Sequence, residues 1–356
     1  MTDRVPVMVL TGYLGAGKTT LLNRILCGDG SRRYAVIVNE FGEIGIDNDL
    51  IVSAEEEIVE MSNGCICCTV RGDLVRTLHQ LLSRRGAFDC IVIETTGIAN
   101  PGPVIQTFFI DHVLQAGTIL DSVTTVVDAR HIGLRLADSP AAAEQIAFAD
   151  QIVLNKTELV TGQELRAVEA RLKKLNPFAP IHHARRADVD LDKLLGRRSF
   201  DMQRILSLEP EFLNDRSEHE HEYGNGSGNG NGNGNGNGNG HDSEHDHGLD
   251  ASHDNGITSV SLTSHTPLDG GKLSGWLNDL VAGSGRDILR AKGILDLRDE
   301  DRRLVFQSVH MLLEADFQRQ WRPQEPRVSK LVFIGRNLDK QALQAGLASC
   351  EMGCGA

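Results

Sequence analysis

The chain has 356 residues, enough for two domains of ordinary size, and its 40% apolar residues can form a buried core. No run of about 18 apolar residues and no signal-peptide pattern occurs, which predicts a cytoplasmic protein with no membrane partner. The net charge of −13 argues against nucleic acid as a partner, because phosphate contacts need a basic surface.

Short β-branched runs alternate with segments of helical length over the first half of the chain. Apolar strands separated by helices are typical of a mostly parallel sheet with helices on both faces. We therefore predict an α/β domain at residues 1–214. Its expected strands cover residues 5–10, 35–38, 90–93, 122–127 and 151–154, and its expected helices cover residues 18–26, 71–84, 104–110 and 162–175.

The first expected strand leads into Gly-Tyr-Leu-Gly-Ala-Gly-Lys-Thr-Thr at residues 12–20, the full phosphate-loop pattern between a strand and a helix. The glycines let backbone N–H groups turn towards phosphate oxygens, and the helix N-terminus adds a positive dipole. Lys18 is expected to reach the β- and γ-phosphates, and the Thr19 hydroxyl is expected to bind Mg²⁺. The other loop residues expected to contact nucleotide are Gly12, Gly15, Ala16, Gly17 and Thr20.

Two later strands end in residues that suit the same nucleotide. Glu94 follows the third expected strand, three residues before Gly97, where a carboxylate can orient a water on Mg²⁺; a solvated acid at a strand end is the alternative. Asn155, Lys156 and Glu158 follow the last of those strands, as a guanine-reading loop does. The Glu158 carboxylate would accept hydrogen bonds from guanine N1–H and its exocyclic amine, which favours GTP over ATP.

Three of the seven cysteines, Cys65, Cys67 and Cys68, lie close together on a turn that begins with glycine. Thiolates are soft ligands for Zn²⁺, Cu(I) or iron. Three thiolates leave one coordination position open, which suits transfer of a metal ion better than a structural site. Glu43 and His112 are candidate additional ligands. A redox dithiol is the alternative function of this motif.

The four remaining cysteines are less informative. An odd number of cysteines in a chain without a signal peptide predicts reduced thiols rather than disulfides. Cys27 and Cys90 lie among apolar residues and are predicted to be buried. Cys350 and Cys354 belong either to a terminal thiol pair or to a frayed tail.

The composition changes abruptly at residues 215–256, where a glycine–asparagine alternation is flanked by acidic, histidine-rich clusters. The alternation has no apolar side chains to bury, which predicts a disordered linker. Its histidines form either a weak reservoir of divalent metal or part of an acidic, solubilising spacer. A smaller α+β domain is predicted at residues 257–350. Its expected strands cover residues 257–266, 294–297, 304–309 and 328–334, and its expected helices cover residues 269–281 and 339–347.

Several of these motifs occur together in one known family. The phosphate loop, Asn-Glu-Phe-Gly-Glu at residues 39–43, Asn-Gly-Cys-Ile-Cys-Cys at residues 63–68 and Glu-Thr-Thr-Gly at residues 94–97 resemble the CobW-like G-proteins. Within that family the chain is most similar to the bacterial YjiA-type branch. The resemblance continues after the linker, in Arg-Ala-Lys-Gly at residues 290–293 and in Trp321.

The resemblance implies a P-loop GTPase domain, a C-terminal CobW domain and GTP hydrolysis that is slow until a metal stimulates it. It also implies a metallochaperone that delivers Zn²⁺, or in some branches Co²⁺ or Fe²⁺, to a client protein. By this resemblance Glu43 supports the metal-binding cysteines, and Asp47 senses Mg²⁺. Two positions depart from the family, since Val38 replaces a glutamate of the YjiA-type branch and Glu158 replaces the usual aspartate.

Two other functions remain open at the level of sequence. One is a non-catalytic metal buffer or sensor gated by GTP. The other is an activator dedicated to one cobalt or iron enzyme, of the cobalamin-synthesis or nitrile-hydratase type. A client metalloprotein and a guanine nucleotide are the expected partners, and a homodimer is one of the alternatives for the assembly.

Overall fold

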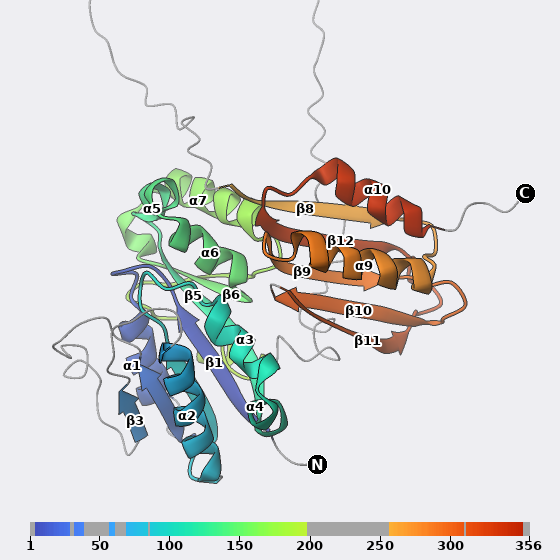
Figure 1. The fold of residues 1–356 in the computed structure, drawn as a ribbon. Helices are drawn as coiled ribbons and strands as arrows, with labels where there is room; N and C mark the ends of the chain where they lie inside the picture. Colours follow the sequence, from blue (N-terminus) through green and yellow to red (C-terminus); the bar gives the residue numbers. More distant parts are fainter. Residues whose placement is uncertain are drawn as a thin grey trace, which may run out of the picture.

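The computed structural model describes residues 4–28, 32–38, 57–60, 69–84, 86–197, 256–309 and 311–351. Within these residues the chain forms two β-sheets, a larger one from the first half of the sequence and a smaller one from the second (Figure 1). No helix of this described part is long and apolar enough to cross a membrane.

Seven parallel strands form the larger sheet within the described residues: β1 (Val5–Thr11), β2 (Tyr34–Val38), β3 (Glu57–Glu60), β4 (Cys90–Glu94), β5 (Thr118–Asp128), β6 (Gln151–Asn155) and β7 (Ile181–His183). Their order is β3-β2-β4-β1-β5-β6-β7, so β1 lies in the centre, between β4 and β5. Strands β2, β4 and β6 are buried along their whole length, as expected for a parallel sheet covered on both faces. Because the seven strands run parallel, their carboxyl ends all lie at one edge of the sheet.

Helices cover both faces of this sheet. On one face α1 (Lys18–Gly28) packs against Met8 and Leu10 of β1. Val7 and Val9 point to the opposite face, because side chains alternate along a strand. That face is covered by α2 (Thr69–Ser83), α3 (Gly102–Ile110), α4 (His112–Gly117), α5 (Ile132–Asp138), α6 (Pro140–Phe148) and α7 (Gly162–Leu175). Two short 3₁₀ turns, η2 (Thr157–Leu159) and η3 (Leu191–Lys193), complete the described part of this half.

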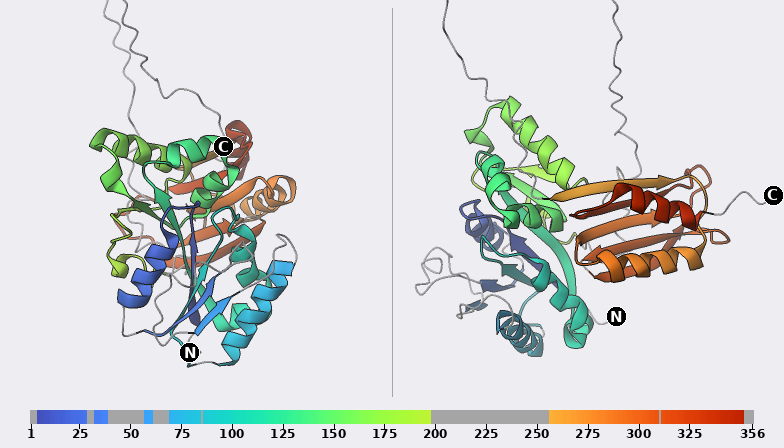
Figure 2. Two further views of the ribbon diagram at one scale, coloured as in Figure 1. Left: turned by 90° about the vertical axis from the view of Figure 1, so that its left-hand side faces the viewer. Right: turned by 45° about the horizontal axis from the view of Figure 1, so that its top comes forward.

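Five antiparallel strands form the smaller sheet within the described part of the second half: β8 (Ile257–Ser264), β9 (Ile288–Leu295), β10 (Arg302–Val309), β11 (Leu312–Gln320) and β12 (Ser329–Arg336). Their order is β11-β10-β9-β12-β8. Helices α9 (Gly270–Ser284) and α10 (Lys340–Cys350) pack on one face, over Phe306 and Phe333 (Figures 1 and 2). From the opposite face Leu289 and Val332 join the apolar cluster of the larger sheet's helices, so the two halves share a core.

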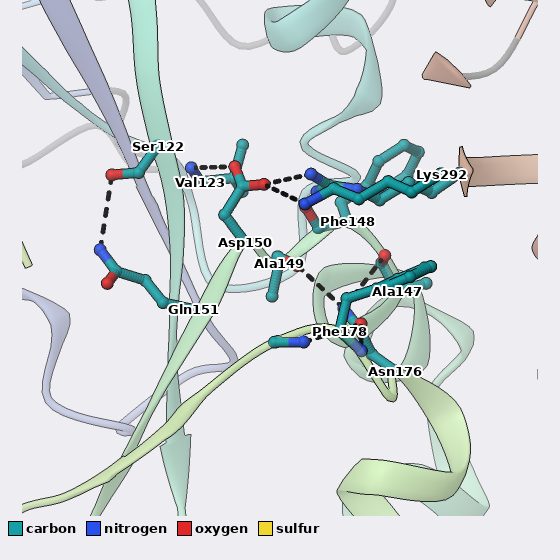
Figure 3. A network of polar contacts seen from close by, with 12 residues as sticks. Ser122, Val123, Ala147, Phe148, Ala149, Asp150, Gln151, Asn176, Phe178 and Lys292 are labelled. Atoms are coloured by element: carbon teal, nitrogen blue, oxygen red, sulfur yellow. Dashed lines mark hydrogen bonds and ion pairs between the residues drawn. The ribbon is translucent and has the colours of Figure 1, made fainter. Parts of the chain in front are cut away.

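A buried carboxylate joins the two sheets. Asp150 directly precedes β6, and its Oδ2 accepts a hydrogen bond from the backbone N–H of Val123 in β5 over 2.8 Å. Its Oδ1 accepts from the Arg290 guanidinium and lies 3.8 Å from Lys292 Nζ, both on β9 (Figure 3). Arg290 also donates to the backbone carbonyl of Phe148 at the end of α6. The three charged side chains are at most 4% exposed, so their charges have been removed from water.

The predicted fold class is confirmed, and α7 has the predicted bounds. The sequence does not predict α4, α5 or α6, which have nine residues or fewer. In the second half β11 is not predicted, and the strand placed at residues 294–297 is in fact β9, which begins at Ile288. The sequence pattern does not predict the start of β9, because it contains Arg290 and Lys292 and charged residues are rarely fully buried. The predicted linker at residues 215–256 lies, apart from Gly256, outside the described residues.

Replacing Asp150 with Ala should strongly destabilise the protein, because Arg290 and Lys292 would lose the carboxylate that compensates their buried charges. We expect the free energy of unfolding to fall by roughly 3–5 kcal/mol, measured by urea denaturation. The matched control is Asp301→Ala, which removes an 82% exposed carboxylate. This control should cost at most about 1 kcal/mol. Equal losses in the two variants would contradict the compensating role of Asp150.

Candidate functional site

The segment between β1 and α1 follows a backbone path that needs glycine. Gly12, Gly15 and Gly17 adopt φ angles of +142°, +72° and +108°, which strain residues that carry a side chain. A Cβ on Gly12 would also lie only 2.2 Å from the carbonyl oxygen of Val126 in β5. Lys18 follows as the first residue of α1 and is 9% exposed. Glycine peptides, a helix N-terminus and a lysine at one place fit the phosphates of a nucleotide.

Glu94 at the end of β4 lies beside this loop. It is 5% exposed, and its Oε1 accepts a hydrogen bond from the Thr19 hydroxyl over 3.2 Å. The next residue, Thr95, donates its backbone N–H to the carbonyl of Leu10 over 2.9 Å and its hydroxyl to Thr11 Oγ1 over 2.8 Å. These bonds hold β4 against β1 where both strands end. A hydroxyl and a carboxylate at one point are the oxygen ligands that Mg²⁺ prefers.

The turn after Glu94 contacts the phosphate loop directly. A Cβ on Gly97 would lie 2.7 Å from the backbone nitrogen of Leu14, so these two segments touch. The Gln145 side chain in α6 donates from Nε2 to the carbonyls of Gly97 and Ala99, over 3.2 and 3.0 Å. The sequence analysis does not identify Gln145, because nothing in the local pattern of α6 distinguishes it.

Asn155 at the end of β6 ties two loops together. Its Nδ2 donates to the carbonyl of Ala16 in the phosphate loop over 2.9 Å. Its Oδ1 accepts from the backbone N–H of Ala187 over 2.8 Å. The side chain reaches the phosphate loop only because residue 17 is glycine, since a Cβ on Gly17 would lie 2.5 Å from Asn155 Nδ2. Glu158 lies three residues further on, exposed in η2.

Asp128 at the end of β5 is a second site residue that the sequence analysis does not identify. Its Oδ2 accepts from Lys156 Nζ over 2.7 Å and lies 3.0 Å from His131 Nδ1. Burial alone would raise the pKa of Asp128, but hydrogen bonds from Lys156 and His131 outweigh burial and hold this pKa below its usual range. The sequence does contain a signal for Asp128, because this residue is an acid at the end of an apolar strand, as Glu94 is.

A pocket of about 260 Å³ opens between the phosphate loop, the end of β5 and helices α5 and α6. Asp128 and Lys156 form part of its wall, together with Tyr13 and Leu14 of the phosphate loop. The Arg135 guanidinium lies 5.3 Å from the centre of the Tyr13 ring and closes one side. The loops on β1 and β6 therefore border one hollow at the carboxyl edge of the sheet.

The predicted metal ligands cannot be placed in the same way. His112 is exposed at the start of α4. In the described parts of the chain, no three His, Cys, Asp or Glu residues lie close enough to hold a metal ion. The other candidates, Cys65, Cys67, Cys68, Glu43 and Asp47, lie outside the described residues, so their roles stay predictions.

The isolated cysteines differ in exposure. Cys90 is buried as predicted, and burial raises the pKa of its thiol to about 12. The prediction for Cys27 is wrong, because this residue is exposed on α1, where Ile25 and Leu26 take the inward positions. Cys350 is buried in α10, and burial raises the pKa of its thiol as well.

Two family models match the chain. The model described as the CobW/HypB/UreG nucleotide-binding domain matches residues 6–183. The model described as the cobalamin synthesis protein cobW C-terminal domain matches residues 257–351. The first match covers the larger sheet and its phosphate loop, and the second covers the smaller sheet, as the resemblance in the sequence predicts.

Similar proteins are known from several organisms. The zinc chaperone YjiA of Escherichia coli is 35% identical over 349 residues, which cover 97% of this chain and 98% of that protein. The zinc chaperone CobW of Sinorhizobium sp is 30% identical, over 97% of each chain. The zinc-regulated GTPase metalloprotein activator 1 of Schizosaccharomyces pombe is 45% identical over 186 residues, 50% of this chain and 45% of that protein. The crystal structure of Zn(II)-bound YjiA GTPase from E. coli superposes with a TM-score of 0.73 at 30% identity, over 98% of this chain and 100% of that one.

The lowered pKa of Asp128 makes a prediction about stability and pH. A carboxyl whose pKa is lower in the folded than in the unfolded state stabilises the fold above the unfolded value of about 3.9, and this contribution is lost as the pH falls. The difference in unfolding free energy between wild type and Asp128→Asn should therefore be largest near neutral pH and shrink towards about pH 3. Urea denaturation across this range measures it. A difference that does not vary with pH would contradict the hydrogen-bonded carboxylate.

Proposed function

Because this chain belongs to the CobW/HypB/UreG family of nucleotide-binding proteins, we propose that it is a GTPase that binds a transition metal, zinc, and delivers it to a client protein. Two features support the nucleotide half of this proposal: the backbone path of the phosphate loop and the hydrogen bond from Thr19 to Glu94. The thiolate motif in the sequence supports the metal half. So do the names of the relatives, two of which are zinc chaperones and one a zinc-regulated GTPase.

Hydrolysis in this site rests on positioning and on neutralising charge. Lys18 is the first residue of α1, and from there its side chain would reach the β- and γ-phosphates. The Thr19 hydroxyl would bind Mg²⁺, with Glu94 beside it acting through a water, and the bound Mg²⁺ would neutralise phosphate charge. Glu94 would also orient the attacking water, since it ends β4 beside the phosphate loop.

The contacts of the loop after β6 support guanine as the base. Asn155 fixes this loop to the phosphate loop, and Lys156 donates a hydrogen bond to Asp128 at the end of β5. Glu158 follows in an exposed turn, where its carboxylate can accept from the N1–H and amine of guanine. Adenine offers no such pair of donors, so this residue would select GTP.

The sheet topology supports a link between nucleotide and metal. The segment at residues 39–49 follows β2, and the cysteines follow β3. Strands β2 and β3 are parallel to β4 and β1, so they end at the same edge as the phosphate loop. We therefore propose that Mg²⁺–GTP orders residues 39–49 and brings Glu43 towards the cysteines, and that hydrolysis loosens the metal for the client.

Replacing Lys18 with Ala should abolish GTP hydrolysis, because the charge of the triphosphate would no longer be neutralised in the transition state. Phosphate release under saturating GTP and Mg²⁺, with and without Zn²⁺, measures it. Lys272→Ala removes an exposed lysine of α9 and should keep the wild-type rate. Retention of the wild-type rate by Lys18→Ala would overturn the assignment of the phosphate loop.

Saturation with a non-hydrolysable GTP analogue and Mg²⁺ should tighten Zn²⁺ binding by about 10-fold or more, within the usual range of coupling between two sites. Competition with a chromogenic chelator measures the affinity. The triple replacement of Cys65, Cys67 and Cys68 with Ser should remove this site, whereas Cys27→Ser, at an exposed cysteine, should not.

The same titration separates the alternatives. If the analogue leaves Zn²⁺ affinity unchanged, the proposed link between nucleotide and metal is wrong. If the triple variant keeps the wild-type affinity, the cysteines are not the metal site. The buffer or sensor function needs a separate measurement, the steady-state turnover of GTP with the client absent and present, and no turnover in either case would support it.

A further inference from the structure

Helix α6 lies between the two sheets and contacts both (Figure 1). Two adjacent residues of this helix, Glu144 and Gln145, are buried, at 8% and 1% exposure, and their side chains make contacts in different directions. The helix has nine residues, and Ser139 at its N-terminus makes no capping hydrogen bond with its side chain. A helix this short is marginal alone, so its orientation depends on what it packs against.

The contacts of Gln145 lead to the nucleotide side. Its Nε2 donates to the carbonyls of Gly97 and Ala99, and its own backbone carbonyl accepts from the Thr125 hydroxyl of β5 over 2.8 Å. Both ends of this residue are therefore fixed. Gly97 in turn touches Leu14 of the phosphate loop and lies three residues after Glu94. Gln145 thus holds the turn that connects the carboxylate of the site to α3.

The contacts of Glu144 and of the helix end lead to the smaller sheet. Glu144 forms an ion pair with Arg336, the last residue of β12. The carbonyl of Phe148 accepts from Arg290 of β9, whose guanidinium also binds Asp150. The side chain of Glu144 is 10% exposed and that of Arg336 34% exposed, so water screens this pair only in part. Two strands of the smaller sheet therefore anchor one helix at two points.

We propose that α6 is the element through which the C-terminal sheet positions the Gly97 turn, with Gln145 as a positioning residue for GTP hydrolysis; this rests on the proposed GTPase function. The chain of contacts runs from Arg336 through Glu144 and Gln145 to the carbonyls of Gly97 and Ala99. Because Glu144 and Gln145 are adjacent in one rigid turn, a shift at the ion pair displaces the amide as well. A partner that moves β12 would thereby change the rate of hydrolysis.

Two variants each remove a contact at one end of this series of contacts. Gln145→Met keeps the length of the side chain but has no N–H donor for the carbonyls of Gly97 and Ala99. Arg336→Ala removes the ion pair between β12 of the C-terminal sheet and Glu144 of α6. A displaced turn should mainly affect the chemical step, and we expect each variant to lower kcat by about 10-fold. The KM for GTP and the affinity for GDP should stay within about 2-fold of wild type.

The controls separate positioning from simple loss of structure. Arg327→Ala removes an arginine that pairs with Asp296 and Asp301 in the connections between strands of the C-terminal sheet, away from α6, and it should leave kcat unchanged. Arg336→Lys retains the charge opposite Glu144 and should restore most of kcat. If one pathway carries the effect, the double variant of Gln145 and Arg336 should be no slower than the slower single variant. Thermal melting shows whether each variant is folded.

Several results would overturn the proposal. A wild-type kcat in folded Arg336→Ala would show that the ion pair does not reach the site. Losses that multiply in the double variant would show two independent effects. Equal losses in Arg327→Ala and Arg336→Ala would indicate general destabilisation. A wild-type protein that hydrolyses no GTP would instead refute the proposed function, a different outcome from any of these.

Discussion

The parallel pairing of β1 with β4 on one side and β5 on the other is the constraint on which the candidate site depends. Leu10 lies beside Glu94 in one neighbour and beside Thr124 in the other. On the next pair of strands Asp128 lies beside Asn155. A slip of one residue in any of these pairs would turn the side chains to the opposite face. The register alone therefore gathers the phosphate loop, both carboxylates and the loop after β6 at one edge, where α/β sheets bind their ligands.

Backbone contacts then set the shape of the site more than side-chain charge does. Gly12 passes so close to the carbonyl of Val126 that no side chain fits there. Asn155 uses its donor for the carbonyl of Ala16 and its acceptor for the N–H of Ala187, in a buried place where an unpaired amide would be costly. The phosphate loop is thus held from the β5 side and from the β6 side. Such a fixed loop suits an anion, because its backbone donors need little rearrangement on binding.

The parts of the site that the sequence predicts are those formed by contiguous residues. The phosphate loop, Glu94 and the loop after β6 each follow an apolar strand within a few residues, so local spacing is enough. The contacts that the sequence does not predict join residues far apart, 48 positions for Gln145 and Gly97 and 140 for Arg290 and Asp150. Such pairs leave no periodic signal in either segment. The same reason explains β9, whose buried charges look exposed until their partner on the other sheet is known.

The interface between the sheets combines two kinds of contact with different roles. Ala142, Ala143 and Ala147 of α6 are small and buried, so they allow close packing but do not determine one relative orientation. The directional contacts of Asp150 and of the Phe148 carbonyl with Arg290 do determine it, because their geometry fails when the sheets slide. A purely apolar surface could be equally stable. Its orientation would be less well defined, and so would that of the helix that holds Gly97 beside the phosphate loop.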